Sequence, residues 1–80
     1  MIGNHRNSES HTYPKGFTVY VKVENTDLKI SGEASKIIIK SCENSEININ
    51  TPGLQELVLG LNFNGGCDIN INEPVQKVYM

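Results

Sequence analysis

The sequence has no tryptophan, and aromatic residues make up only 6% of its 80 positions. It also nearly lacks alanine, the strongest helix former, whereas asparagine, isoleucine and valine are abundant. Its apolar runs are short, and none approaches the roughly 20 residues that a membrane-spanning helix needs. The composition therefore favours a single domain built from strands rather than helices.

The sequence also has no large excess of positive or negative charge. The chain carries 7 basic and 9 acidic residues, a balance that gives no indication of a nucleic-acid or anionic-membrane partner. Residues 1–16 lack the apolar core of a signal peptide. We therefore expect a chain that is made and kept in a reducing, cytoplasmic compartment and binds neither nucleic acid nor membrane.

Cysteine occurs only twice, as Cys42 and Cys67, without a CxxC motif or a nearby histidine pair. A disulfide between them is the alternative, but we expect two unpaired thiols. Cys42 takes a core position, and Cys67 sits at a predicted turn, where it could be an exposed, reactive thiol, although neither Lys nor Arg lies nearby in the sequence to lower its pKa. The histidines, His5 and His11, have no third ligand nearby, so we expect no metal site and no cofactor.

Apolar residues alternate with polar ones over short stretches from Phe17 onward, which is typical of half-buried strands. Residues 1–15 are polar and are interpreted as a flexible arm, and residues 16–80 as the folded domain. The predicted strands cover residues 17–23, 28–31, 36–41, 47–50, 56–63, 69–72 and 75–79.

The sequence also repeats itself. VENTDLKI at residues 23–30 matches CENSEINI at residues 42–49, and a shift of nineteen superposes residues 17–30 on residues 36–49. A third pass ends at Asp68–Ile71, twenty-two residues further on. A period near twenty with two strands predicts a short right-handed parallel β-helix of three to four coils. A meander or small sandwich is the alternative, although neither requires equivalent strands to recur.

Stacked coils place equivalent residues in columns about 4.8 Å apart. The expected inward columns are Val23 with Cys42, Leu28 with Ile47 and Ile69, and Ile30 with Ile49 and Ile71. Asn25 and Asn44 share a turn position, where asparagine tolerates left-handed backbone and can form hydrogen bonds along the stack. Gly65 and Gly66 would relax the same corner in the longer third coil.

Acidic residues recur at the turns and form the candidate partner-binding site. Asp27, Glu46 and Asp68 are expected to form one column, and Glu24 and Glu43 a second. Such an edge could meet a basic protein surface or hold Ca²⁺ weakly, and the alternative is a hydrated turn with splayed carboxylates. We predict no catalytic residue and no enzymatic activity.

The two ends of the repeat predict self-association. The sequence Val78-Tyr79-Met80 lies inside a predicted strand at one end of the coil stack. The predicted strand at residues 17–23 forms the uncapped edge at the other end. Unpaired strand edges recruit further strands, so we expect a twofold dimer through the last coil. The predicted contact residues are Val75, Val78, Tyr79 and Met80. The alternative is that the arm folds back over the first coil.

One stretch resembles a known family. It comprises Asn25-Thr26-Asp27-Leu28-Lys29-Ile30-Ser31-Gly32, then Ile37-Ile38-Ile39, then Cys42-Glu43-Asn44. Over residues 17–60 the chain is similar to the C-terminal domain of cyclase-associated proteins, which tubulin-folding cofactor C shares.

The resemblance implies a right-handed parallel β-helix that binds monomeric actin and dimerises by exchange of terminal strands. The cofactor C branch acts on a GTPase-like partner through a catalytic arginine, but the sole arginine here, Arg6, lies in the polar arm. We therefore expect a non-enzymatic, self-associating protein-interaction module, with actin as the first candidate partner. A structural protein assembled by stacking of coils, for instance a viral or surface component, is the alternative.

Overall fold

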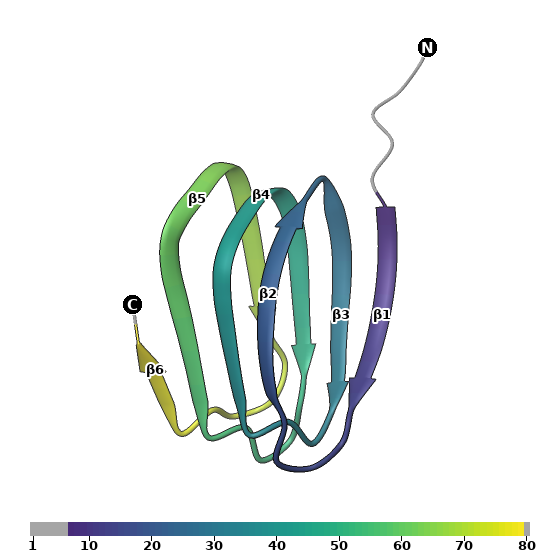
Figure 1. The fold of residues 1–80 in the computed structure, drawn as a ribbon, viewed down its shortest axis with the longest axis vertical. Coiled ribbons are helices and arrows are strands. Elements are labelled where there is room, and N and C mark those ends of the chain that lie inside the picture. The colour runs from purple at the N-terminus through teal and green to yellow at the C-terminus, as the bar shows by residue number, and fades with distance from the viewer. Residues whose placement is uncertain (1–6, 80) are drawn as a thin grey trace.

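The computed structural model describes residues 7–79, and every strand pairing among them is parallel. These residues wind into a β-solenoid of about 4 turns and contain no helix, which confirms the predicted fold class (Figure 1). The strands are β1 (Asn7–Tyr13), β2 (Thr18–Glu24), β3 (Thr26–Gly32), β4 (Lys36–Asn50), β5 (Glu56–Ile71) and β6 (Lys77–Tyr79). The long strands β4 and β5 each bend over the top of one coil, so each contains two of the predicted strands.

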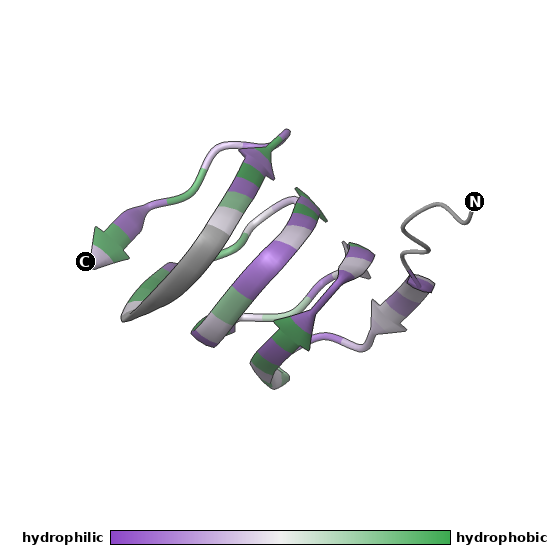
Figure 2. Ribbon diagram, turned by 90° about the horizontal axis from the view of Figure 1, so that it is seen from above, coloured by the Kyte–Doolittle hydropathy of each residue, from purple (hydrophilic) through white to green (hydrophobic). Residues whose placement is uncertain are grey.

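The solenoid has two flat faces joined at the corners. Face A consists of β2, residues 36–43 of β4, residues 56–64 of β5, and β6. Face B consists of β1, β3, residues 45–50 of β4 and residues 67–71 of β5. Figure 2, seen from above, shows β1 and β6 at opposite ends of the stack. The first and last turns are therefore half-coils that lie on different faces.

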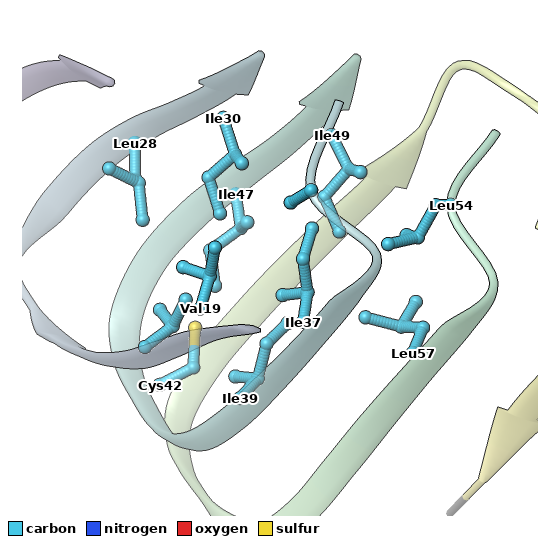
Figure 3. Close-up of a cluster of buried hydrophobic side chains, with 12 residues drawn as sticks. Val19, Leu28, Ile30, Ile37, Ile39, Cys42, Ile47, Ile49, Leu54 and Leu57 are labelled. Atoms are coloured by element: carbon cyan, nitrogen blue, oxygen red, sulfur yellow. The ribbon is translucent and has the colours of Figure 1, made fainter. Parts of the chain in front are cut away.

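The core fills the space between the two faces. Leu28 lies beside Ile47 in the register, and Ile47 lies beside Ile69, as the repeat predicts. Ile30 and Ile49 form the next inward column, and both are fully buried (Figure 3). Burial of each large aliphatic side chain contributes about 1.5–3 kcal/mol, so these columns are the main source of stability.

The register of face A differs from the prediction by one residue. A shift of nineteen places Val19 beside Ile38, but the structure pairs Val19 with Ile37. The pairing of β2 with β4 is irregular after Val21, and Lys40 is the extra residue in β4. This bulge restores the predicted pairing of Val23 with Cys42. The correction matters because a slip of one residue exchanges the inward and outward side chains of a strand.

Residues 7–13 do not belong to a flexible arm. They form β1, which pairs with β3 along its whole length, so the expected arm is wrong for these residues. Glu9 and His11 take the positions that Leu28 and Ile30 occupy in the next coil. The strand therefore has no apolar alternation, and backbone hydrogen bonding rather than burial places it in the sheet. Thus the alternative interpretation, an arm folded over the first coil, is the one observed.

The corner between the faces is made by residues with positive φ. Asn25 and Asn44 have φ of 51° and 49°, as their shared turn position predicts. Between Asn64 and Cys67 the third coil has one residue more than the second, and Gly66 there has φ of 89°. The corner is therefore built in the same backbone conformation in all three coils, with glycine replacing asparagine in the longest one.

Candidate functional site

The predicted acidic column is present on face B. Asp27 lies beside Glu46, and Glu46 lies beside Asp68, with all three at outward positions of their strands. The site therefore arises from period-two alternation: the inward neighbours are buried on β3 and β4 and half-buried on β5, and the acids point away from them. Three carboxylates in a row raise the local negative potential without any enclosed pocket.

Amide side chains form hydrogen bonds to the middle carboxylate of this column. Asn48 donates a hydrogen bond from Nδ2 to Glu46 Oε2 at 3.2 Å, and Asn70 donates to the same oxygen at 3.3 Å. An open depression of about 390 Å³ lies next to it on the side of β1, where Ser8, Ser10 and Lys29 contribute to its lining. The surface can therefore accept hydrogen bonds and salt bridges from a basic partner.

The second acidic column lies on the other side of the corner. Glu24 and Glu43 are register neighbours at the end of face A, and both are exposed. The third coil has Asn64 at this position, so the column ends there. Asn25 and Asn44 lie between the two acidic columns. The columns therefore form two edges of one corner rather than a single acidic surface.

The expectation of two free thiols is wrong. Cys42 and Cys67 form a disulfide that joins β4 to β5, with their Cα atoms 5.8 Å apart. Cys42 is fully buried, as its core position predicts (Figure 3). A reactive thiol at Cys67 is thereby excluded in this state. The cytoplasmic location stays a prediction, and the disulfide weighs against it because reducing compartments keep thiols reduced.

The turn position of Cys67 explains the error. The equivalent residues in the earlier coils, Thr26 and Ser45, are both buried, although hydroxyl residues at a turn suggest exposure. Their hydroxyl groups donate to the backbone carbonyls two residues earlier, at 2.9 Å and 2.8 Å, so the polar atoms are satisfied inside the corner. The third-coil residue at this inward position therefore faces the core, where Cys42 lies.

The C-terminal end exposes the apolar residues that sequence analysis assigns to self-association. Val78 is inward by register with Leu57, yet it is 48% exposed because no described strand covers it. Tyr79 is 47% exposed and points outward, and Val75 is half-buried against the core. Met80 lies outside the described residues. Ile71, which sequence analysis did not assign to the contact, is 42% exposed at the same end.

The N-terminal end is polar by contrast. On β1 the inward positions carry Glu9 and His11, and His11 Nε2 lies 3.1 Å from Glu9 Oε1. The inward positions of the two terminal strands therefore differ in chemistry: on β1 they carry the Glu9–His11 pair, whereas on β6 the inward residue is the aliphatic Val78.

A row of apolar side chains on the outside of face A was not predicted from the sequence. Tyr20 lies beside Ile38, Ile38 beside Val58, and Val58 beside Tyr79. The shift of nineteen that relates the coils pairs Tyr20 with the buried Ile39, so it does not reveal this row. Only the corrected register brings these four residues into one outward row.

Within residues 7–79 no cluster of three or more His, Cys, Asp or Glu side chains is suited to a metal ion. His5 lies outside this range. The same residues contain no helix that is long and apolar enough to cross a membrane.

The geometry defines a class of protein: a short parallel β-solenoid with two flat outer faces, one acidic corner and an apolar C-terminal end. Comparisons with protein-family models, curated proteins and solved structures found no match to the chain. The resemblance to cyclase-associated proteins therefore rests on the quoted residues alone.

Proposed function

We propose that the chain is a non-catalytic, self-associating protein-interaction module. The observation that carries this proposal is the exposure of Ile71 and Val78, at 42% and 48%, in the last coil. Both residues continue inward columns that are fully buried in the preceding coil. Aliphatic side chains in that position gain about 25 cal/mol for each Å² that a second molecule removes from water.

The strand edge beside these residues supports the same proposal. Residues 67–71 of β5 pair with β4, and no other strand within residues 7–79 pairs with them. β6 extends one strand further on face A. A twofold axis parallel to the strands would place β6 of each copy beside residues 67–71 of the other. Both half-coils would then be completed, with antiparallel pairing.

Contact between like ends is favoured over head-to-tail contact. A head-to-tail arrangement would lay the polar inward residues of β1, Glu9 and His11, over Ile69 and Ile71. That would bury a carboxylate against aliphatic side chains, which costs several kcal/mol unless the charge is paired or neutralised. The C-terminal ends have no such conflict.

Sedimentation velocity over a concentration series tests the dimer. Val78→Asp should shift the chain toward monomer, because it adds a charge to the contact while leaving an already exposed side chain exposed. The matched control is His11→Asn at the opposite end, which should leave the association unchanged. A wild-type chain that stays monomeric up to several hundred micromolar would contradict the proposal.

The acidic column on face B is the proposed contact with another protein, and actin is the first candidate because of the family resemblance. Purified actin monomers titrated with the chain provide the test. Glu46→Lys and Asp68→Lys should each weaken binding, whereas Glu33→Lys, an exposed loop residue elsewhere, should not. Binding that ignores all three reversals would remove this column from the proposal.

An assembly protein is the second candidate, and the half-coils favour it. Because β1 lies on face B and β6 on face A, copies stacked head to tail would continue the alternation of faces without a gap. Such contacts do not close, so particles would grow with concentration instead of stopping at a dimer. Light scattering during the same concentration series separates the two outcomes.

A further inference from the structure

The outward row on face A runs along the whole described solenoid. Tyr20 and Tyr79 lie at its two ends and are 64% and 47% exposed, and Ile38 and Val58 lie half-buried between them. We call these four residues the apolar stripe. Outward positions of a sheet that faces water normally carry polar side chains, so a continuous apolar stripe is a candidate contact surface.

Charged side chains flank the stripe on both sides. On one side Lys36 Nζ lies 3.4 Å from Glu56 Oε1, and both residues belong to the outward column that precedes the stripe. On the other side the bulge residue Lys40 places its Nζ 5.3 Å from the ring centroid of Tyr20. Beside Lys40, β5 has Gly60. A Cβ at Gly60 would lie 2.9 Å from the Lys40 carbonyl oxygen, so a side chain does not fit there. The stripe is therefore an apolar centre with a polar rim, as in protein interfaces.

We propose that face A packs against face A of a second copy, around a twofold axis that runs parallel to the strands between β4 and β5. This axis reverses the order of the coils in the second copy and keeps the position along the strand. Ile38 then faces Val58 of the second copy, and Tyr20 faces its Tyr79. The stripe covers itself, because each residue and its counterpart exchange places across the axis.

The flanking charges select this axis. Under the same operation Lys36 faces Glu56 of the second copy, and Glu56 faces its Lys36, so this pair is self-complementary. Lys77, which continues the same column beside Glu56, faces the neutral Thr18. A twofold axis along the solenoid would instead place Lys36 against Lys40 of the second copy, and like charges would meet.

The size of the patch predicts a weak contact. Four strands at about 4.8 Å spacing, and residues 36–40 at about 3.3 Å per residue, give a patch of roughly 14 by 13 Å. This area is below that of interfaces in stable dimers, so dissociation constants in the high micromolar range or weaker are expected. The contact shares Tyr79 of β6 with the end-to-end dimer, but that dimer depends on Val78 and Ile71 and uses none of Lys36, Ile38 or Glu56.

Charge reversal tests the proposal without relying on the fold alone. In the Lys36→Glu variant, acid faces acid at both rim positions, and in the Glu56→Lys variant lysine faces lysine. Neither variant should associate through face A with itself. A mixture of the two restores opposite charges at both positions, because each molecule supplies what the other lacks. Any loss of the intramolecular Lys36–Glu56 pair is shared by both variants and is not repaired by mixing.

The measurement is the binding of amino-terminally labelled Lys36→Glu chain by unlabelled chains, followed by fluorescence anisotropy at low salt. Unlabelled Glu56→Lys chain should bind at least tenfold more tightly than unlabelled Lys36→Glu chain. Adding Ile38→Thr to both partners should abolish that difference. The substitution Lys29→Glu on face B, which makes the same change in charge, should leave this difference in affinity unchanged.

Equal affinity in every combination would overturn the proposal, as would binding of the chain through these residues only to phosphatidylserine vesicles or to another protein. Because the end-to-end contact is the same in all these variants, its presence or absence shifts every combination equally. Failure of the face-to-face proposal is therefore distinguishable from failure of the proposed function.

Discussion

Asn44 donates a hydrogen bond from its Nδ2 to the Oδ1 of Asn25 at 2.6 Å, between neighbouring coils at the corner that joins the two faces. Both residues have left-handed backbone, and the Asn25 N–H donates to the Glu43 carbonyl at 2.9 Å. One residue type thus meets two requirements at the corner: tolerance of positive φ and a side-chain bond along the stack. This combination explains why asparagine occurs at the same position in two successive coils.

The two roles of Asn44 can be separated by substitution. Asn44→Gly keeps the backbone conformation and loses the side-chain bond, so it should lower the free energy of unfolding by about 1 kcal/mol. Asn44→Leu loses the bond and also adds left-handed strain, for a total of about 2–3 kcal/mol. Urea unfolding of both variants checks this order. Equal losses would mean that the corner carries no backbone strain.

The disulfide should contribute more than any single hydrogen bond. It closes a loop with a sequence separation of 25 residues, and loop-closure entropy for that length corresponds to about 3 kcal/mol. We expect a reductant to lower the stability of the wild-type chain by about that amount and to leave the Cys67→Ser variant unaffected. Urea unfolding with and without reductant provides the measurement. An unchanged midpoint for the wild type would show that the two sulfurs are not bonded in solution.

The core columns could be predicted from sequence because their signal is direct. Leu28, Ile47 and Ile69 recur in an identical local phrase, and each alternates with polar neighbours, so both the strand and its inward face follow. β1 gave no such signal, since Glu9 and His11 stand where the columns carry leucine and isoleucine. A strand held by backbone pairing alone has no hydropathy pattern to detect.

The candidate sites were only partly accessible to the same reasoning. The acidic column followed from the repeat, because Asp27 and Glu46 keep a spacing of nineteen on face B. The apolar stripe did not, since the bulge at Lys40 changes the spacing to eighteen between Tyr20 and Ile38. A bulge of one residue leaves no composition signal, yet it decides which face each side chain occupies.

Gly32 is expected to be required for the pairing of β1. It has φ of 101°, and a Cβ there would collide with the Tyr13 carbonyl oxygen and lie 2.8 Å from the Tyr13 nitrogen. Gly32→Ala should therefore both strain the backbone and displace the end of β1. Hydrogen exchange at residues 7–13 should become faster.

Gly53 supplies the matched control for this prediction. It also has positive φ, 79°, but a Cβ there would meet nothing within 4 Å. Gly53→Ala should cost about 1 kcal/mol from strain and leave exchange in β1 unchanged. Unchanged exchange in both variants would show that Gly32 does not hold β1 in place.

Thr51 offers a substitution that should stabilise the chain. Its side chain is fully buried, and among the described residues its Oγ1 has no hydrogen-bond partner. A buried hydroxyl without a partner costs about 1–3 kcal/mol, so Thr51→Val, which keeps the shape, should raise the free energy of unfolding by about 1 kcal/mol. Thr26→Val is the control with the opposite sign, because the Thr26 hydroxyl donates to the Glu24 carbonyl at 2.9 Å and its removal strands that acceptor. Urea unfolding of the two variants should therefore give changes in opposite directions. Destabilisation by both would show that the Thr51 hydroxyl is bonded in solution.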